Sequence, residues 1–297
     1  MENKILELAE KHKIKIKENS IKIDNSGLDF QVAFCSDSNN REWVFRIPRR
    51  DDVFPRTKVE KQALDIVNSE KFSFQAPDYK IYSEQLIAYP KLDGFPVGTI
   101  CPEKKMYIWA VDINNLPDNF FNTLGKALFE LHNIDLIKLN GTDIKIQTPL
   151  QVRADMKARM EKVKHEFGVG EKLWERWNKW LENDSYWPEK SGFIHGELHA
   201  GHILIDSSVN ITGFIDWTEV KYSDLAGDFS VFNKIFGDKN LDKLIKAYQN
   251  NGGYIYKNFK NHIIEYIAAY PVGVAEYAMI SGMDFIVEMA KKELQVI

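Results

Sequence analysis

One stretch, from Phe193 to Trp217, constrains the fold more than any other part of the chain. It alternates short apolar runs with polar turns and reads FIHGELHAGHILIDSSVNITGFIDW. Apolar runs bounded by turn residues predict three short strands, and Gly196 and Gly201 allow the backbone to turn tightly between them. Ionisable side chains gather in these turns, namely His195, Glu197, His199, His202 and Asp216. Since such a cluster is a poor way to build a core, we expect a functional site here.

Two chemistries fit this cluster. The three histidines are spaced by four and three residues, which suits a zinc site on one face of a helix. The glycines and the β-branched runs argue against a helix and therefore against zinc. In kinase-type phosphoryl transfer, a loop carboxylate accepts the proton of the attacking hydroxyl, and two further residues hold Mg²⁺. Because Glu197, His202 and Asp216 stand at the required spacings, we favour this chemistry over an ordinary polar β-hairpin.

The same residues carry a family resemblance. HGELHAGHILID (195–206), followed by GFIDW (213–217), resembles the catalytic and metal loops of antibiotic phosphotransferases, which share the protein-kinase fold. Within that group the chain most resembles the macrolide 2′-phosphotransferases, through residues 26–34, 43–67 and 86–94. The resemblance spans essentially the whole chain. It implies an α+β fold of two lobes, with a five-stranded antiparallel sheet in residues 1–91 and a mainly helical lobe in residues 92–297.

The resemblance also implies an activity and assigns roles. The expected reaction moves the γ-phosphate of GTP, or alternatively ATP, to the 2′-hydroxyl of a macrolide amino sugar. Glu197 would accept the hydroxyl proton, His195 would orient the catalytic loop, and His202 and Asp216 would bind Mg²⁺. The family has Asp where this chain has Glu197, and the extra methylene extends the carboxylate by about 1.5 Å. Since misplacements near 1 Å can cost on the order of 10²-fold in rate, either the loop has shifted or the chain is a weak or inactive relative.

The amino-terminal lobe is expected to bind the nucleotide. Arg46 takes the place of the kinase lysine in a strand at 43–47, and Glu60, in a predicted helix at 57–68, is its expected partner. Arginine can contact phosphate and carboxylate together, and its apolar strand disfavours a merely solvated basic run. Gly27 lies in the turn over the phosphates, although a lone glycine is equally typical of an ordinary hairpin. The nucleotide base is expected at the hinge backbone, near Ala88, Tyr89 and Lys91.

The carboxyl-terminal third is expected to bind the acceptor. Helices are predicted near 239–250, 257–270 and 272–293, and the apolar segment 266–279 suits the wall of a macrolide pocket or, equally, the core of the lobe. Glu276 or another carboxylate would face the dimethylammonium of the sugar. Asp228 is expected to support the catalytic loop from behind, or else to cap a helix. The full set of substrate-binding candidates is Tyr270, Val274, Glu276 and Tyr277.

Composition narrows the partners. The 297 residues carry a net charge of −4, so no basic field attracts nucleic acid. Only Cys35 and Cys101 occur, which indicates the reducing cytoplasm. No apolar run of membrane-spanning length is evident, and we expect a monomer whose partners are a macrolide and a purine nucleoside triphosphate. Two rival functions remain: a kinase for another acceptor such as a polycationic aminoglycoside, which would need an acidic cleft, and a nucleotide-binding pseudokinase.

Overall fold

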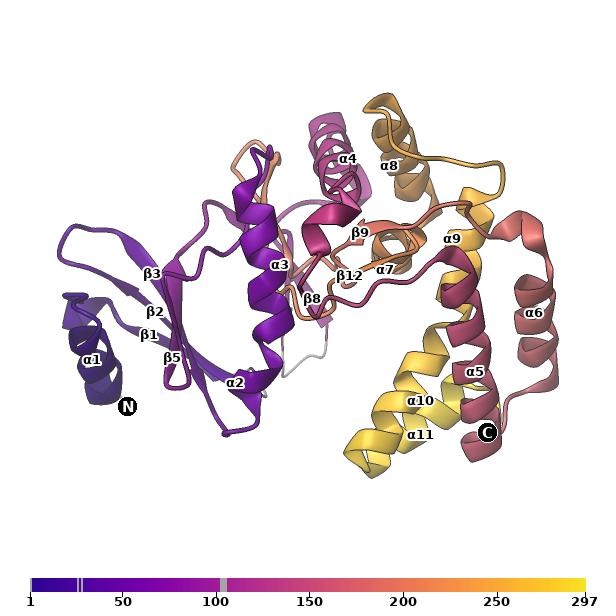
Figure 1. Cartoon of the computed structure of the whole chain (residues 1–297), viewed down its shortest axis with the longest axis horizontal. Helices are drawn as coiled ribbons and strands as arrows, with labels where there is room; N and C mark the ends of the chain where they lie inside the picture. Colours follow the sequence, from indigo (N-terminus) through magenta and orange to yellow (C-terminus); the bar gives the residue numbers. More distant parts are fainter. Residues whose placement is uncertain (1, 26, 28, 102–105) are drawn as a thin grey trace.

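The amino-terminal lobe is built around an antiparallel sheet of five strands in the order β1-β2-β3-β5-β4 (Figure 1). This confirms the predicted sheet. The computed structural model describes residues 2–25, 27, 29–101 and 106–297. The strands of the sheet are β1 (Lys22–Asp24), β2 (Phe30–Ser36), β3 (Glu42–Pro48), β4 (Ile81–Ser83) and β5 (Leu86–Pro90).

Alternation along β3 gives the sheet two different faces. Phe45 belongs to a core cluster that α1 (Glu2–Lys11) covers from outside. Val44 belongs instead to the large core cluster that includes α3 (Lys58–Ser69), which follows the short α2 (Val53–Arg56). Because successive side chains of a strand point to opposite faces, Arg46 shares the face of Val44 and is directed toward the second lobe.

Short strands frame the polar turns of the second lobe, as predicted. After the hinge, β6 (Phe95–Pro96) pairs with β10 (Ile203–Ile205), which pairs in turn with β11 (Ile211–Phe214). β9 (Gly192–Ile194) pairs with β12 (Lys221–Ser223). β7 (Gly98–Cys101) and β8 (Met106–Trp109) form a separate hairpin. The turns that follow β9 and β11 are therefore fixed at both ends.

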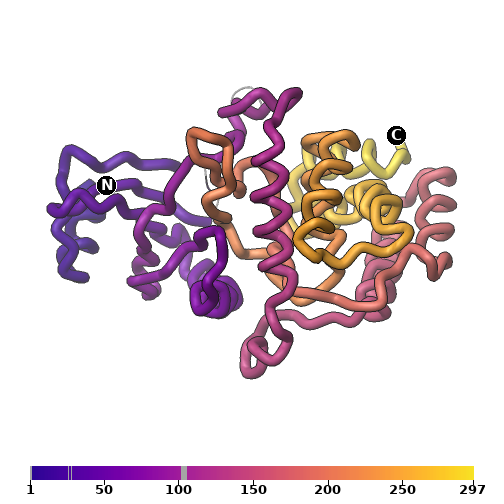
Figure 2. The backbone as a smooth tube through the Cα atoms, turned by 90° about the horizontal axis from the view of Figure 1, so that it is seen from above, coloured from indigo at the N-terminus to yellow at the C-terminus, as the bar shows by residue number. Residues whose placement is uncertain are grey.

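The rest of the second lobe is mainly helical. α4 runs beside α8 through the middle of the molecule (Figure 2). α5, α6, α10 and α11 form a second core cluster, in which Trp177 and Trp180 are buried. The helices are α4 (Asp118–His132), α5 (Pro149–Phe167), α6 (Glu171–Glu182), α7 (Ala226–Phe236), α8 (Asp238–Asn250), α9 (Phe259–Ala268), α10 (Tyr270–Ser281) and α11 (Asp284–Glu293).

The predicted helix at 272–293 is interrupted. Gly282 adopts φ = 61°, a left-handed conformation that ends α10, and α11 begins two residues later. Helices α9 and α10 together form a run, Phe259–Ser281, that is long and apolar enough by composition to cross a membrane, contrary to the expectation that no such run exists. Ile263 lies in the large core cluster, and Val272 and Ala275 lie in the second, but only 39% of the apolar window is buried, so packing accounts for part of this apolar composition.

Candidate functional site

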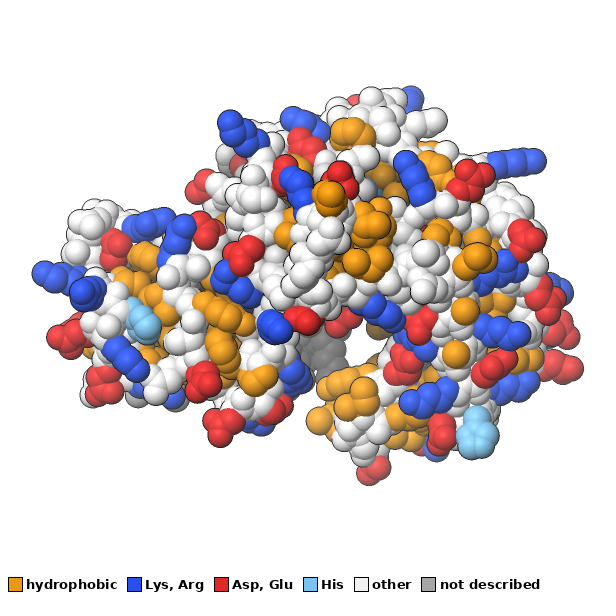
Figure 3. Space-filling view, in the orientation of Figure 1, with side chains coloured by type: hydrophobic (Ala, Val, Ile, Leu, Met, Phe, Trp, Pro, Cys, Tyr) orange, Lys and Arg blue, Asp and Glu red, His pale blue; other side chains and the backbone are white. Residues whose placement is uncertain are grey.

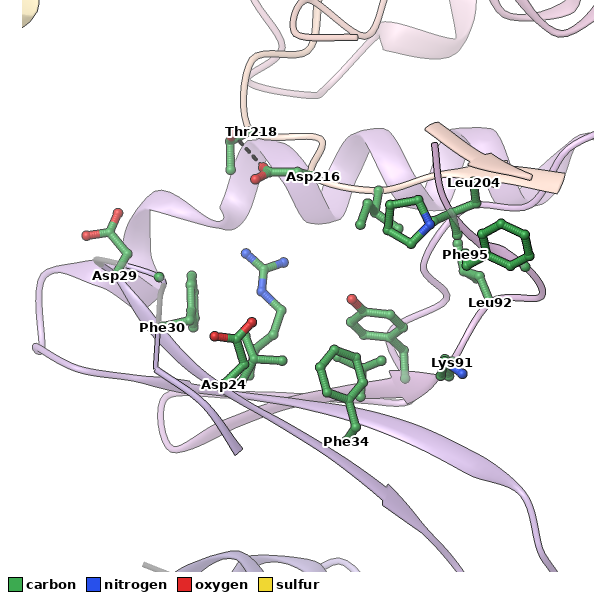
Figure 4. A pocket seen from close by; sticks show the side chains of 18 residues that line it. Asp24, Asp29, Phe30, Phe34, Lys91, Leu92, Phe95, Leu204, Asp216 and Thr218 are labelled. Atoms are coloured by element: carbon green, nitrogen blue, oxygen red, sulfur yellow. Dashed lines mark hydrogen bonds between the residues drawn. The ribbon is translucent and has the colours of Figure 1, made fainter. Parts of the chain in front are cut away.

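A cavity of about 680 Å³ lies between the lobes. It extends from Lys91, Leu92 and Phe95 at the hinge to Asp216 and Thr218 in the second lobe (Figure 4). Its walls are mainly apolar along the sheet, and they carry charged groups toward Asp216. A cavity that is mainly apolar along the sheet and charged near Asp216 suits a nucleotide.

Arg46 is held in this cavity by a buried ion pair. Its Nη1 lies 2.7 Å from Oε1 of Glu60, whose side chain is 1% exposed. The guanidinium carbon also lies 4.2 Å from the centroid of the Phe30 ring. Burial alone would lower the pKa of Arg46, but the Glu60 carboxylate raises it above its ordinary value, so the cation is retained. The structure thus joins the two residues that the sequence predicted to pair.

The polar turns bring Glu197, His202 and Asp216 together. The Nδ1 of His202 donates to the carbonyl oxygen of Glu197 at 2.8 Å, and its Nε2 lies 3.5 Å from Oδ2 of Asp216. The backbone N–H of Ile215 donates to the carbonyl of His202 at 3.0 Å and ties one turn to the other. Asp216 adopts φ = 64°, a left-handed conformation that is costly outside glycine and is typical of functional sites.

The pKa values of Glu197 and Asp216 are shifted in opposite directions. Burial, together with the nearby Asp216 and Glu219, raises the pKa of Glu197 to about 7. Burial would also raise the pKa of Asp216, but the imidazole of His202, a hydrogen bond from Thr218 and the charge of Arg46 bring it below its ordinary value. With pKa values shifted apart in this way, Glu197 can exchange a proton near neutral pH while Asp216 stays anionic.

His195 supports the turn that carries Glu197. Its ring is fully buried, and Nε2 donates to the carbonyl of Ile215 at 3.1 Å, while Nδ1 lies 3.4 Å from the backbone N of Glu197. Burial lowers the pKa of His195 to about 4, so the ring is neutral. The sequence predicted that His195 orients the loop, and its contacts with the loop backbone are those of a positioning residue.

Asp228 lies behind the same turn. One carboxylate oxygen accepts from the N–H of Gly196 at 2.7 Å, and the other accepts from the N–H of His195 at 3.1 Å. The second oxygen is also 3.0 Å from Nε2 of His132, and Nδ1 of His132 is 2.9 Å from the hydroxyl of Tyr248. A buried hydrogen-bond chain from α8 through α4 and α7 therefore supports the turn that carries Glu197. Of the two roles considered for Asp228, the structure supports the first.

His202 and Asp216 fit a divalent cation with few protein ligands. Within the described ranges, no group of three or more His, Cys, Asp or Glu side chains could hold a metal by itself. Mg²⁺ usually takes one or two protein ligands and completes its octahedron with phosphate oxygens and water. Nε2 of His202 and Oδ2 of Asp216 lie 3.5 Å apart and could bind one ion together, and imidazole is a less usual ligand for Mg²⁺ than an oxygen.

The hinge differs in detail from its predicted form. Ala88 is fully buried in the outer core cluster, and its carbonyl accepts from the N–H of Lys80 at 2.9 Å. The N–H of Lys91 donates to the carbonyl of Glu42 at 2.9 Å. Tyr89, Lys91 and Gly27 line the cavity, whereas Ala88 does not. Leu92 also lines the cavity, and its N–H bonds to no other backbone carbonyl of the described chain. Leu92 is therefore a better candidate than Ala88 or Lys91 for the hinge residue that donates a hydrogen bond to a nucleotide base.

A second cavity, of about 670 Å³, lies on the other side of Thr218. Thr218 and its neighbour Glu219 form one edge, and α5, α7 and α10 supply the other walls. Since Thr218 also lines the first cavity, the two spaces meet beside Asp216 and the turn that carries Glu197. This arrangement can hold one ligand in each cavity, with the charged residues between the two ligands.

The four residues that were predicted to bind the acceptor substrate lie in different environments. Tyr270 and Glu276 line the second cavity. Val274 is only 6% exposed and belongs to the second core cluster, so the prediction that it binds substrate is wrong. Glu276 accepts two hydrogen bonds from Arg159, at 2.8 and 2.6 Å, and its charge is already paired. Tyr277 is exposed on α10 but does not line the cavity.

A broad apolar surface adjoins this cavity. Figure 3 shows the molecule hollowed between the lobes, with hydrophobic side chains gathered over the end of the second lobe that α10 and α11 form. The exposed apolar side chains of this region are Tyr270, Tyr277, Ile280, Met283, Phe285 and Met289.

Comparison with known proteins assigns the family. The model of the phosphotransferase enzyme family matches residues 20–260. The chain belongs to this phosphotransferase family. This family member is also 38% identical, over 292 residues, to the uncharacterized protein YcbJ of Bacillus subtilis (strain 168), with 98% of this chain and 95% of that protein covered.

Solved structures support the same assignment. Macrolide 2′-phosphotransferase MphH from Brachybacterium faecium, as the apoenzyme, matches with a TM-score of 0.91 at 31% identity, over 98% of this chain and 97% of that chain. Macrolide 2′-phosphotransferase type I matches with a TM-score of 0.88 at 31% identity, over 98% and 96%. The GDP and kanamycin complex of APH(2″)-IIia shares the fold, with a TM-score of 0.77 at 16% identity. The predicted resemblance to macrolide phosphotransferases and the predicted kinase-like α+β fold are confirmed.

Sequence reasoning missed several residues of this phosphotransferase. His132 gives no local signal in the sequence, and only the fold brings it to Asp228 from 96 positions away. Tyr248 lies 116 positions from His132 and gave no local signal. Thr218, two residues after the predicted metal ligand Asp216, could have been found by its place in the turn, because Thr and Ser side chains commonly bond neighbouring groups.

Proposed function

We propose that this phosphotransferase transfers the γ-phosphate of GTP to the 2′-hydroxyl of a macrolide amino sugar and so inactivates the drug. The observation that carries the proposal is that two cavities share Thr218, beside Asp216 and the turn that carries Glu197, in a chain whose structure matches two macrolide 2′-phosphotransferases over nearly its whole length.

Donor binding is supported by both ends of the first cavity. The base lies against Val44 and Leu204 and takes a hydrogen bond from the N–H of Leu92, which is free of backbone partners in the described residues. At the opposite end Arg46 offers a guanidinium to the phosphates, oriented by Glu60. When bound, Mg²⁺ held by His202 and Asp216 would offset the charge of the phosphates.

Glu197 accepts the proton of the attacking hydroxyl. Its carboxyl group stands on a turn that is fixed by His202, His195 and Asp228, and its raised pKa suits proton exchange near neutral pH. Because phosphoryl transfer depends mainly on positioning and on charge stabilisation, this fixed turn is the main contribution of the protein to the rate.

The acceptor side favours a macrolide over an aminoglycoside. The exposed apolar surface of α10 and α11 offers contact area for a large apolar ring. The charges that line the second cavity are nearly balanced, with three cationic side chains, Lys145, Arg159 and Lys221, and four carboxylates, Asp155, Glu219, Asp224 and Glu276. A polycationic acceptor needs a strongly acidic cleft, which this balance does not provide, whereas a ligand with a single ammonium group needs only one free carboxylate.

A transfer assay tests the proposal. The purified chain is incubated with Mg²⁺ and γ-labelled GTP or ATP, and with erythromycin or kanamycin as acceptor. We expect label on erythromycin, with GTP as the better donor, and none with a Glu197→Gln variant. Transfer to kanamycin alone would support the aminoglycoside alternative. Nucleotide binding without any transfer would support the pseudokinase alternative that Glu197 suggests.

A further inference from the structure

The charges of the second cavity are already paired, with two exceptions. Arg159 pairs with Glu276, and Lys145 lies 3.3 Å from Asp155. Asp224 is 1% exposed, accepts from the N–H of Ala226 at 3.0 Å and lies 2.7 Å from Nε2 of His262. The two charged residues of the cavity without an ion pair within 4.0 Å among the described residues are Glu219 and Lys221.

Glu219 lies next to the residue that precedes Glu197. A Cβ atom at Gly196 would stand 2.3 Å from the carbonyl oxygen of Glu219 and 3.1 Å from its Cβ, so the two backbones are in close contact. The position of Gly196, beside Asp228 on one side and Glu219 on the other, leaves no room for a side chain. Glu219 itself is exposed to the cavity, and its charge is therefore open to a ligand.

We propose that Glu219 binds an ammonium group that the acceptor carries beside the hydroxyl to be phosphorylated. This assignment rests on the proposed function and names the group of the substrate that is recognised. An amino sugar with its amine on the carbon next to the acceptor hydroxyl places the cation a few ångströms from the base. Glu219 has the required charge, its backbone contacts the residue that precedes Glu197, and it forms no ion pair within 4.0 Å among the described residues.

Lys221 limits how many ammonium groups the cavity accepts. It lies two residues after Glu219 and lines the same cavity, and its pKa is lowered, chiefly by burial. A second ammonium group near Lys221 would meet a like charge in a partly desolvated space. The pair therefore selects an acceptor with one cation over an acceptor with several. Glu276, which the sequence had suggested for the ammonium, is left to hold Arg159 in place.

Binding calorimetry separates this assignment from the question of turnover. Erythromycin and its 3′-de(dimethylamino) analogue are titrated into the chain with Mg²⁺ and a non-hydrolysable GTP analogue. Glu219→Gln should weaken erythromycin binding about 10- to 100-fold, the range of a lost charge-assisted hydrogen bond, and leave binding of the neutral analogue unchanged. Asp155→Asn is the matched control, because it removes the same charge from the same cavity but from a carboxylate already paired with Lys145.

The outcomes are distinct. Equal losses for both variants, or an equal loss for both ligands, would overturn the assignment, because a general field effect would then account for the data. Unchanged erythromycin binding in Glu219→Gln would overturn it as well. Transfer to erythromycin by the wild-type chain, followed by an unchanged Glu219→Gln titration, would leave the proposed function standing and remove Glu219 alone. No binding of erythromycin by the wild-type chain would overturn both.

Discussion

Replacing Asp228 with Asn tests the buried hydrogen bonds that hold the catalytic turn. The carboxylate accepts from Gly196 N–H, His195 N–H and the Nε2 of His132, at 2.7, 3.1 and 3.0 Å. The amide of Asn keeps one acceptor oxygen and turns an N–H₂ group toward the remaining donors. His132 can adapt by exchanging tautomers with the help of Tyr248, but a backbone N–H has no such freedom.

At least one buried backbone N–H is therefore left without an acceptor. An unsatisfied buried donor costs about 1–3 kcal/mol, so the free energy of unfolding should fall by about that amount in urea titrations. The turn that carries Glu197 also loses its anchor, and a displacement near 1 Å can lower kcat on the order of 10²-fold. The KM for GTP should change little, because the hydrogen bonds of Asp228 go to His132, His195 and Gly196 and not to Arg46 or the hinge. A loss of stability with kcat unchanged would refute the idea that Asp228 positions Glu197.

Three further predictions follow from the site. Asp216→Asn should abolish Mg²⁺-dependent transfer while the unfolding curve stays near that of the wild-type chain; persistent transfer would remove Asp216 from the metal site. The pKa of His195 is about 4 when folded and about 6.5 when unfolded, so the unfolded chain binds a proton first as the pH falls. This difference leaves the free energy of unfolding undiminished above pH 6.5 and lowers it by about 3 kcal/mol between pH 6.5 and pH 4. A His195→Gln variant should lose this pH dependence in urea titrations over that range. Tyr248→Phe removes one hydroxyl from the buried chain and should cost about 1 kcal/mol of stability, with a fall in kcat smaller than that of Asp228→Asn; an equal fall in both variants would contradict the proposed order along the chain.

Local patterns were sufficient to predict the frame of the site. Short apolar runs and glycines predicted the strands on either side of Glu197 and Asp216, because turn chemistry and alternation act over a few residues. The pairing of Arg46 with Glu60 was also predictable, since a strand followed by a helix brings such residues together and the resemblance supplied the register.

Long-range contacts were not predictable in this way. His132 and Tyr248 acquire their roles only when α4, α7 and α8 pack together. The pattern of segment 266–279 could not tell which side of α10 faces the cavity, and so Val274 was wrongly expected to bind substrate. Glu276 could not be recognised as an ion-pair partner because Arg159 lies 117 positions away. Gly282 ended α10 by a left-handed conformation that outweighed the apolar pattern on either side.

Mass spectrometry of erythromycin after incubation with GTP and Mg²⁺ tests the central claim most directly. The account predicts one added phosphoryl group, located on the 2′-hydroxyl, with the wild-type chain, and none with Glu197→Gln or Asp216→Asn. Unmodified erythromycin with the wild-type chain, or full modification with both variants, would contradict it.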